Sequence, residues 1–263
     1  MSTPGPRTLA HAHHPSWRRR RLDPDHSLGL RLTLAATAAF LVLVPFALLA
    51  LLVLGGWAPL HRLDATVTDA LHGYALDHPA WVTLVRIWTE VFAPMPLRAL
   101  ALLVVIWLLR RGARRLALWV TTTMVVGGLI GPLLKLLVGR DRPDLLDPVA
   151  RAAGYAFPSG HALNAALTAG VLLLVFLPYA GRGRWRVALW IAAVLVAVLT
   201  GLSRVALGVH WASDVLGGWL LGAAVVAATT AAFTSWRAHT GLRPVQPARE
   251  GVAPEVERHP GAA

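Results

Sequence analysis

Three polar clusters interrupt the long apolar segments of this sequence: KLLVGRDRP (135–143), PSGH (158–161) and SRVALGVHWASD (203–214). Each cluster lies at or near the end of an apolar segment. Between them they supply the only lysine of the chain, three arginines, two histidines, three serines and two aspartates. Because charged groups are costly in or beside hydrocarbon, several of them at matching depth indicate a functional site.

The whole sequence has the composition of a polytopic membrane protein. Hydrophobic residues make up 56% of its 263 residues and charged residues only 14%, against about 25% charged in an average soluble domain. A membrane-crossing helix needs about 20 mostly apolar residues. Six segments approach or meet this length: 32–54, 96–109, 116–138, 162–177, 187–202 and 215–233. The second of them is short, and we expect its helix to begin near residue 92.

We therefore expect an all-α fold, a bundle of six transmembrane helices formed by residues 31–236. The flanking segments, 1–30 and 237–263, are rich in proline and arginine and lack an apolar period, which is typical of disordered tails. Between the first two spans, apolar residues recur at helical spacing over 57–93, with Trp81 and Trp88 as interfacial anchors. This segment is expected to form one or two amphipathic helices at the membrane surface. The glycines at 127, 128 and 131 favour close packing of the third span, within the bundle or in a dimer.

The arginines predict the orientation. They gather in the N-terminal tail, at 110–115, at 182–186 and from residue 237 onward, and arginine-rich loops stay in the cytoplasm. With six spans, both termini are then cytoplasmic, and the three polar clusters share the extracytoplasmic face of the cell membrane. The oligomeric state stays open.

Composition also excludes several classes of function. Without cysteine, the chain can form no disulfide, thiolate metal site or cysteine nucleophile. The net charge of +12 raises the alternative of nucleic-acid binding. We reject that alternative because the arginines are distributed between apolar spans instead of forming one soluble basic face.

Three cations suit an anion site. Arginine offers a planar fork for phosphate oxygens and lysine a compact charge. Lys135 and Arg142 are seven residues apart, so a continuous helix would place them on one face, whereas Gly139 and Pro143 favour a helix that ends between them. Arg204 adds the third charge. Any one of them alone would be explained by a long side chain that snorkels to the interface.

The remaining polar residues suit phosphoryl chemistry. Ser159 is a candidate N-cap, which would leave the amides of Gly160 and His161 at a helix N-terminus, a natural phosphate site. His210 and Asp214 are four residues apart, which stacks two side chains on a helix face. There the carboxylate would fix the histidine tautomer. A metal site needs a more acidic cluster, and we interpret Asp141, Asp144 and Asp147, the nearby carboxylates, as solvated loop charges.

Taken together, the three clusters resemble the motifs of the type 2 phosphatidic acid phosphatase superfamily, in order and without a substitution at a defining position. The resemblance implies that His210 is the nucleophile that forms a phosphohistidine, that Asp214 orients it, and that His161 protonates the leaving oxygen and then activates water. It also implies a set of groups that hold the phosphoryl oxygens, without a metal or other cofactor: Lys135, Arg142, Ser159, Gly160 and Arg204.

The resemblance implies a metal-independent phosphatase acting on membrane lipids: phosphatidate, phosphatidylglycerophosphate or polyprenyl (undecaprenyl) diphosphate. An alternative is a lipid-to-lipid phosphotransferase with the same nucleophile, distinguished by the acceptor of the phosphoryl group. A non-enzymatic transporter or scaffold is a third hypothesis, which a charge buried in mid-span would favour. The family also resembles vanadium-dependent haloperoxidases, but those are soluble.

Overall fold

The computed structural model describes residues 24–180 and 183–239, and this part of the chain is helical without any strand. The tails predicted at 1–30 and 237–263 lie largely outside the described residues. The helices, in chain order, are α2 (Pro24–Leu54), α3 (Ala58–Asp77), α4 (Pro79–Val91), α5 (Pro94–Arg110), α6 (Arg114–Val138), α7 (Gly160–Phe176) with a 3-10 turn η1 (Leu177–Tyr179), α8 (Arg184–Ala206) and α9 (Ala212–His239).

Six of the helical segments are long and apolar enough to cross a membrane, so the predicted all-α, six-span membrane fold is confirmed. Two boundaries differ from the sequence-based expectation. α2 begins at Pro24, within the segment predicted as tail. α4 and α5 count together as one candidate span of 32 residues, although the helix is interrupted at Phe92 and Ala93. By length and composition, the candidate for the second span begins at Pro79, before the expected start near residue 92.

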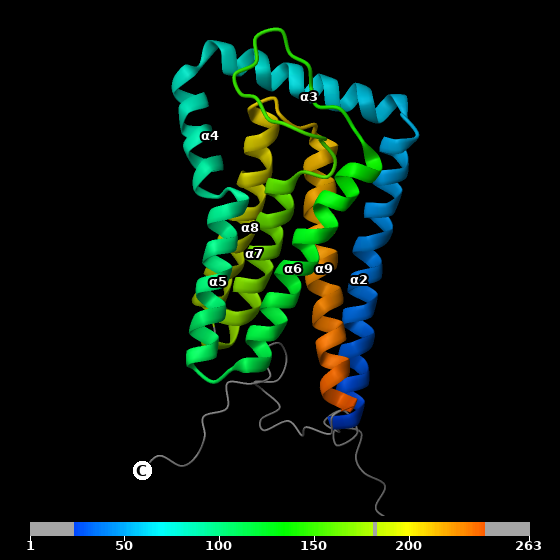
Figure 1. Ribbon diagram of the computed structural model, residues 1–263, viewed down its shortest axis with the longest axis vertical. Coiled ribbons are helices and arrows are strands. Elements are labelled where there is room, and N and C mark those ends of the chain that lie inside the picture. The colour runs from blue at the N-terminus through cyan, green and yellow to red at the C-terminus, as the bar shows by residue number, and fades with distance from the viewer. Residues whose placement is uncertain (1–23, 181–182, 240–263) are drawn as a thin grey trace, which may run out of the picture.

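The amphipathic segment after the first span has two parts with different orientations. α3 lies across one end of the bundle, roughly perpendicular to the spanning helices, and α4 turns back along the bundle toward α5 (Figure 1). Trp57 and Pro59 lie at the start of α3, where a proline in the first turn needs no hydrogen-bond donor. α3 thus covers the end of the bundle that the polar clusters occupy.

α7 is the central helix, packed against α5, α6, α8 and α9. Its neighbours approach it closely through glycines. Leu167 and Leu163 of α7 fill the space in which a side chain at Gly127 or Gly131 of α6 would lie. The glycines of the third span therefore serve packing within the bundle, one of the two roles the sequence left open. Gly128 instead faces Arg98 of α5.

Helix ends bring the three polar clusters together. α6 ends at Gly139, whose φ of 61° is left-handed and favours glycine. Residues 139–159 then form a loop that leads to α7. α8 and α9 are joined by a short turn containing Gly208, also left-handed at φ 65°. The loop and the turn lie at the same end of the bundle as α3 (Figure 1).

Candidate active site

Lys135 and Arg142 are held by backbone carbonyls of the 139–159 loop and, for Arg142, of the turn between α8 and α9. Helix α6 ends between these two residues, at Gly139, as the sequence predicted from Gly139 and Pro143. Lys135 Nζ donates to the carbonyl of Tyr155 at 2.6 Å. The Arg142 guanidinium donates to the carbonyls of Gly154 at 2.8 Å and Val209 at 2.6 Å. Burial lowers the pKa of Arg142, while the charge of Asp214 raises it.

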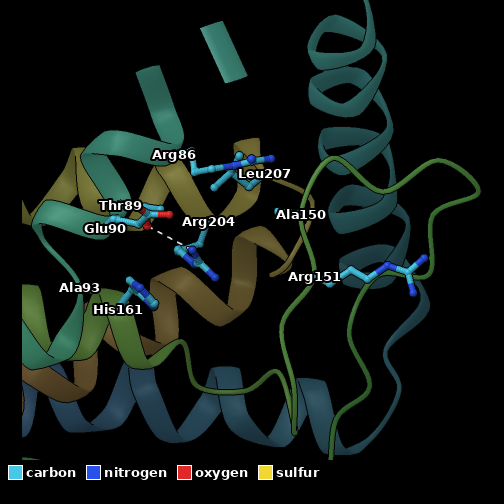
Figure 2. A pocket seen from close by; sticks show the side chains of 9 residues that line it. All are labelled: Arg86, Thr89, Glu90, Ala93, Ala150, Arg151, His161, Arg204 and Leu207. Atoms are coloured by element: carbon cyan, nitrogen blue, oxygen red, sulfur yellow. Dashed lines mark hydrogen bonds between the residues drawn. The ribbon is translucent and has the colours of Figure 1, made fainter. Parts of the chain in front are cut away.

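Arg204 lies in the last turn of α8 and is only 8% exposed. Its Nη1 donates to Thr89 Oγ1 at 3.1 Å, and Nε is buried without a hydrogen-bond partner in the described part of the chain. Figure 2 shows this guanidinium beside His161, in a pocket of about 330 Å³. The pocket is lined by residues of α4, the 139–159 loop, α7 and α8: Arg86, Thr89, Glu90, Ala93, Ala150, Arg151, His161, Arg204 and Leu207.

His210 and Asp214 are paired, but not on one helix face as the spacing predicted. α9 begins at Ala212, so His210 lies in the turn before the helix and Asp214 in its first turn. His210 Nδ1 lies 3.3 Å from Asp214 Oδ2, and that oxygen also accepts the amide of Trp211 at 2.9 Å. The turn is what allows the carboxylate to bind both the imidazole and the backbone.

The partners of His210 define its tautomer. A carboxylate only accepts and a guanidinium only donates. Asp214 on one side and Arg142 Nη1, 3.2 Å from Nε2, on the other therefore require the proton on Nδ1 and the lone pair on Nε2. His210 is 2% exposed, and burial lowers its pKa to about 4 although the hydrogen bond to Asp214 raises it. The resting imidazole is neutral, with its lone pair directed toward the cations.

Ser159 is the N-cap residue of α7, as predicted, but its side chain makes no capping bond. Its Oγ is buried and has no hydrogen-bond partner among the described residues. The Ser159 amide donates to the Asp214 carbonyl at 2.9 Å, which ties the start of α7 to α9. Gly160 has open space where a side chain would be, and His161 follows in the first turn of α7. The start of this helix therefore offers an unused hydroxyl at Ser159 and open space at Gly160 to a ligand.

Two parts of the site escaped the sequence analysis. Arg140 donates to Asp214 Oδ1 at 2.7 Å and to Asp64 Oδ2 of α3 at 2.8 Å. In addition, Arg98 of α5 donates to Asn164 Oδ1 at 2.9 Å, and Asn164 in turn donates to the Gly160 carbonyl at 2.8 Å. The signal that could have indicated Arg140 is its position inside the first cluster. Asp64 and Asn164 lie in no motif.

The charges of the site are unbalanced. In the described part of the chain, the buried carboxylates Asp64 and Asp214 pair with Arg140 and His210, and no ion pair joins a carboxylate to Lys135, Arg142 or Arg204. Asp141, Asp144 and Asp147 are exposed, as expected of solvated loop charges. No three His, Asp or Glu side chains of the described residues gather as a metal site. Arg204 is buried and the other two cations are half-buried. Cations without a counter-charge are costly to remove from water, and an anion with several oxygens would balance them.

Fold and site together define a class: a helical, multi-pass membrane protein with two histidines and uncompensated cations at one end of its bundle. Residues 116–238, which contain all three polar clusters, match the model of the PAP2 superfamily. Over these residues the match confirms the resemblance to the type 2 phosphatidic acid phosphatases.

Several named relatives are similar to part of the chain. The chain is 42% identical over 97 residues to phosphatidylglycerophosphatase B of Bacillus subtilis, covering 36% of this chain and 46% of that protein. It is 34% identical over 122 residues to undecaprenyl-diphosphatase of Sulfolobus acidocaldarius, covering 44% and 54%. A lipid A 1-phosphatase of Rhizobium etli is 34% identical over 110 residues, covering 38% and 43%. The chain thus matches about half the length of these relatives.

A solved structure supports the fold over a larger part of the chain. The crystal structure of a transmembrane PAP2 type phosphatidylglycerolphosphate phosphatase from Bacillus subtilis aligns with a TM-score of 0.67 and 23% sequence identity. The alignment covers 80% of this chain and 99% of that one. The arrangement of helices is therefore shared beyond the residues that match the family model.

Proposed function

We propose that this protein is an integral membrane phosphatase that hydrolyses phosphomonoester or diphosphate groups of lipids. One observation carries the proposal: buried donors are left without partners beside histidines. Arg204 Nε and Ser159 Oγ have no hydrogen-bond partner in the described part of the chain, and the cations around them lack carboxylates. A phosphoryl group offers three anionic oxygens to such donors.

The geometry suits a phosphohistidine mechanism. The lone pair of His210 Nε2 would attack phosphorus as the bond to the leaving oxygen breaks, and Asp214 would hold the proton on Nδ1. His161 would give its proton to the leaving oxygen, and then take one from the water that displaces Nε2. Arg142 Nη1, 3.2 Å from Nε2, would meet an oxygen of the transferred group. Lys135, Arg204, Ser159 and the Gly160 amide would hold the others, supplying the charge stabilisation that phosphoryl transfer requires.

The pocket and the relatives support the proposed substrate class. The pocket in Figure 2 lies beside His161, where the leaving group would be, and we assign it to the lipid side of the scissile bond. The names of the relatives point to phosphatidylglycerophosphate, undecaprenyl diphosphate and lipid A 1-phosphate, and we add phosphatidate from the motif resemblance. The arginine distribution of the sequence supports an extracytoplasmic site with both termini in the cytoplasm.

The test is phosphate release by the purified protein from these four lipids, with EDTA present. We expect turnover of at least one lipid without a divalent ion, since the cations of the site supply the positive charge that Mg²⁺ supplies elsewhere. Absence of phosphate release from all four would contradict the proposal. Activity that EDTA abolishes and Mg²⁺ restores would contradict the metal-independent mechanism. Transfer of label to a second lipid, without free phosphate, would identify a phosphotransferase.

A further inference from the structure

The residue pair Asp64–Arg140 adjoins the His210–Asp214 pair: Arg140 binds Oδ1 of Asp214, and His210 lies beside Oδ2. Asp64 is 1% exposed and Asp214 is fully buried. The Arg140 guanidinium lies between the two carboxylates, with Nη2 on Asp64 Oδ2 at 2.8 Å and Nη1 on Asp214 Oδ1 at 2.7 Å. Asp64 comes from α3, outside the residues 116–238 that match the family model.

Ser213 binds both members of the Asp64–Arg140 pair, and the three residues form a hydrogen-bond network with Asp214. Its amide donates to Asp64 Oδ1 at 2.9 Å and its hydroxyl to Asp64 Oδ2 at 2.5 Å. Arg140 Nη1 also donates to the Ser213 hydroxyl at 2.7 Å. Asp64 therefore binds the residue next to Asp214 directly, and Asp214 itself through Arg140. The backbone at the start of α9 and the carboxylate that orients His210 are both held from α3.

The charges of the network fit a histidine that becomes positive. Two carboxylates around one guanidinium carry a net charge of minus one. In the proposed reaction, which this inference takes as its basis, His210 becomes a positively charged phosphoimidazole. If Arg140 were paired with Asp214 alone, the two charges would cancel and His210 would gain little from its carboxylate. Asp64 restores the negative charge while Arg140 keeps Asp214 in place.

We propose that Asp64 and Arg140 are positioning residues for catalysis: through them, helix α3 holds Asp214 against His210 and preserves the net negative charge that stabilises the phosphorylated histidine. This gives α3 a function beyond covering the end of the bundle. It also predicts that the nucleophile depends on a helix outside the three sequence motifs.

The first test measures turnover of Asp64→Asn on the lipid that the wild-type protein hydrolyses fastest. We expect kcat to fall about 10- to 100-fold, the range found for outer partners of metal-bound histidines, with KM nearly unchanged because no substrate contact is lost. Asp69→Asn is the matched control: it removes the same charge from an exposed position of the same helix and should leave kcat unchanged. Equal kcat in Asp64→Asn and the control would overturn the proposal.

The second test needs no substrate. The pKa of His210 is followed by NMR of histidine-labelled protein, with the signal identified by its loss in His210→Ala. Besides the network, His210 faces Arg142 and Lys135 and lies within electrostatic range of His161, all unchanged in these variants. Removing the negative charge in Asp64→Asn should lower the pKa of His210, and removing the positive charge in Arg140→Gln should raise it.

These opposite shifts separate the proposal from a merely structural role. A structural role would lower the unfolding temperature of both variants and leave the pKa of His210 in the folded fraction where it is in the wild type, which would overturn the proposal. If the wild-type protein released no phosphate from any lipid, the proposed function would fail. The NMR shifts would still decide whether the network acts on His210.

Discussion

At the scale of single residues, the account depends on a buried neutral histidine. A pKa of about 4 for His210, against an ordinary value of 6.5, means that the unfolded chain binds a proton at a pH where the folded protein does not. His210 then lowers the stability of the fold as pH falls through 6.5 toward 4. Above pH 6.5 the histidine is neutral in both the folded and the unfolded chain, and it does not lower the stability of the fold.

We therefore expect the wild-type protein to lose about 2 kcal/mol of unfolding free energy between about pH 7 and pH 5 through this residue. His210→Gln removes the titrating group and should lack this part of the loss. The measurement is unfolding of both proteins in the same detergent at the two pH values. Equal losses in both would show that His210 does not titrate with a lowered pKa.

The site residues that could be predicted from the sequence are those whose residue type and spacing form a motif. Lys135, His161, Arg204 and the His210–Asp214 pair lie in recognisable clusters at the ends of apolar segments, where a charge needs a reason. Asp64 has no such signal, because α3 carries the exposed Asp69 and Asp77 as well and is amphipathic throughout. Only the fold shows that Asp64 is the aspartate that meets Arg140, 76 residues further along the chain.

At the scale of elements, the contact between α9 and the start of α7 holds the site together. A Cβ at Gly218 of α9 would lie 2.6 Å from the Ser159 carbonyl oxygen and 2.8 Å from Ala162 Cβ. The helices could not keep this distance, since backbone atoms cannot move aside as a side chain can. The glycine therefore allows α9, which carries Asp214, to approach the residues that lead to His161.

Gly218→Ala should lower both stability and phosphate release. Overpacking typically costs about 1–3 kcal/mol, and here it would separate Ser159 from Asp214. Gly128→Ala in α6 is the matched control, because its new Cβ would be an ordinary 3.9 Å from Nη2 of Arg98, and alanine favours helix. The readouts are unfolding temperature and activity of the two variants. A Gly218→Ala protein as stable and active as the control would contradict this packing.

Element boundaries were harder to predict than the elements themselves. Hydrophobic length predicts six spans because a bilayer imposes it. The amphipathic pattern over 57–93 could not show that α3 lies across the bundle while α4 continues toward α5, since both helices have one apolar face. That choice is made by tertiary contacts, among them the hydrogen bond from Trp88 of α4 to Thr200 of α8 at 3.3 Å.

At the scale of the whole molecule, the orientation can be tested in a chain that has no cysteine. Asp147 lies exposed in the 139–159 loop, at the end of the bundle that holds the site, and Gly183 precedes α8 at the opposite end. We expect a membrane-impermeant thiol reagent, added to intact cells, to label Asp147→Cys and not Gly183→Cys. Labelling of Gly183→Cys alone would reverse the orientation.

The central claim is that His210 carries the phosphoryl group, and trapping that group tests it most directly. Wild type, His210→Ala and His161→Ala are mixed with a labelled lipid phosphate or an activated aryl phosphate. The reaction is stopped under conditions that preserve phosphohistidine. General acid catalysis contributes about 10²–10⁴-fold, and an activated leaving group does not need it. We predict that His161→Ala accumulates label from the activated substrate and that His210→Ala takes up none. Label on His210→Ala, with none on His161→Ala, would contradict the account and exchange the roles of the two histidines.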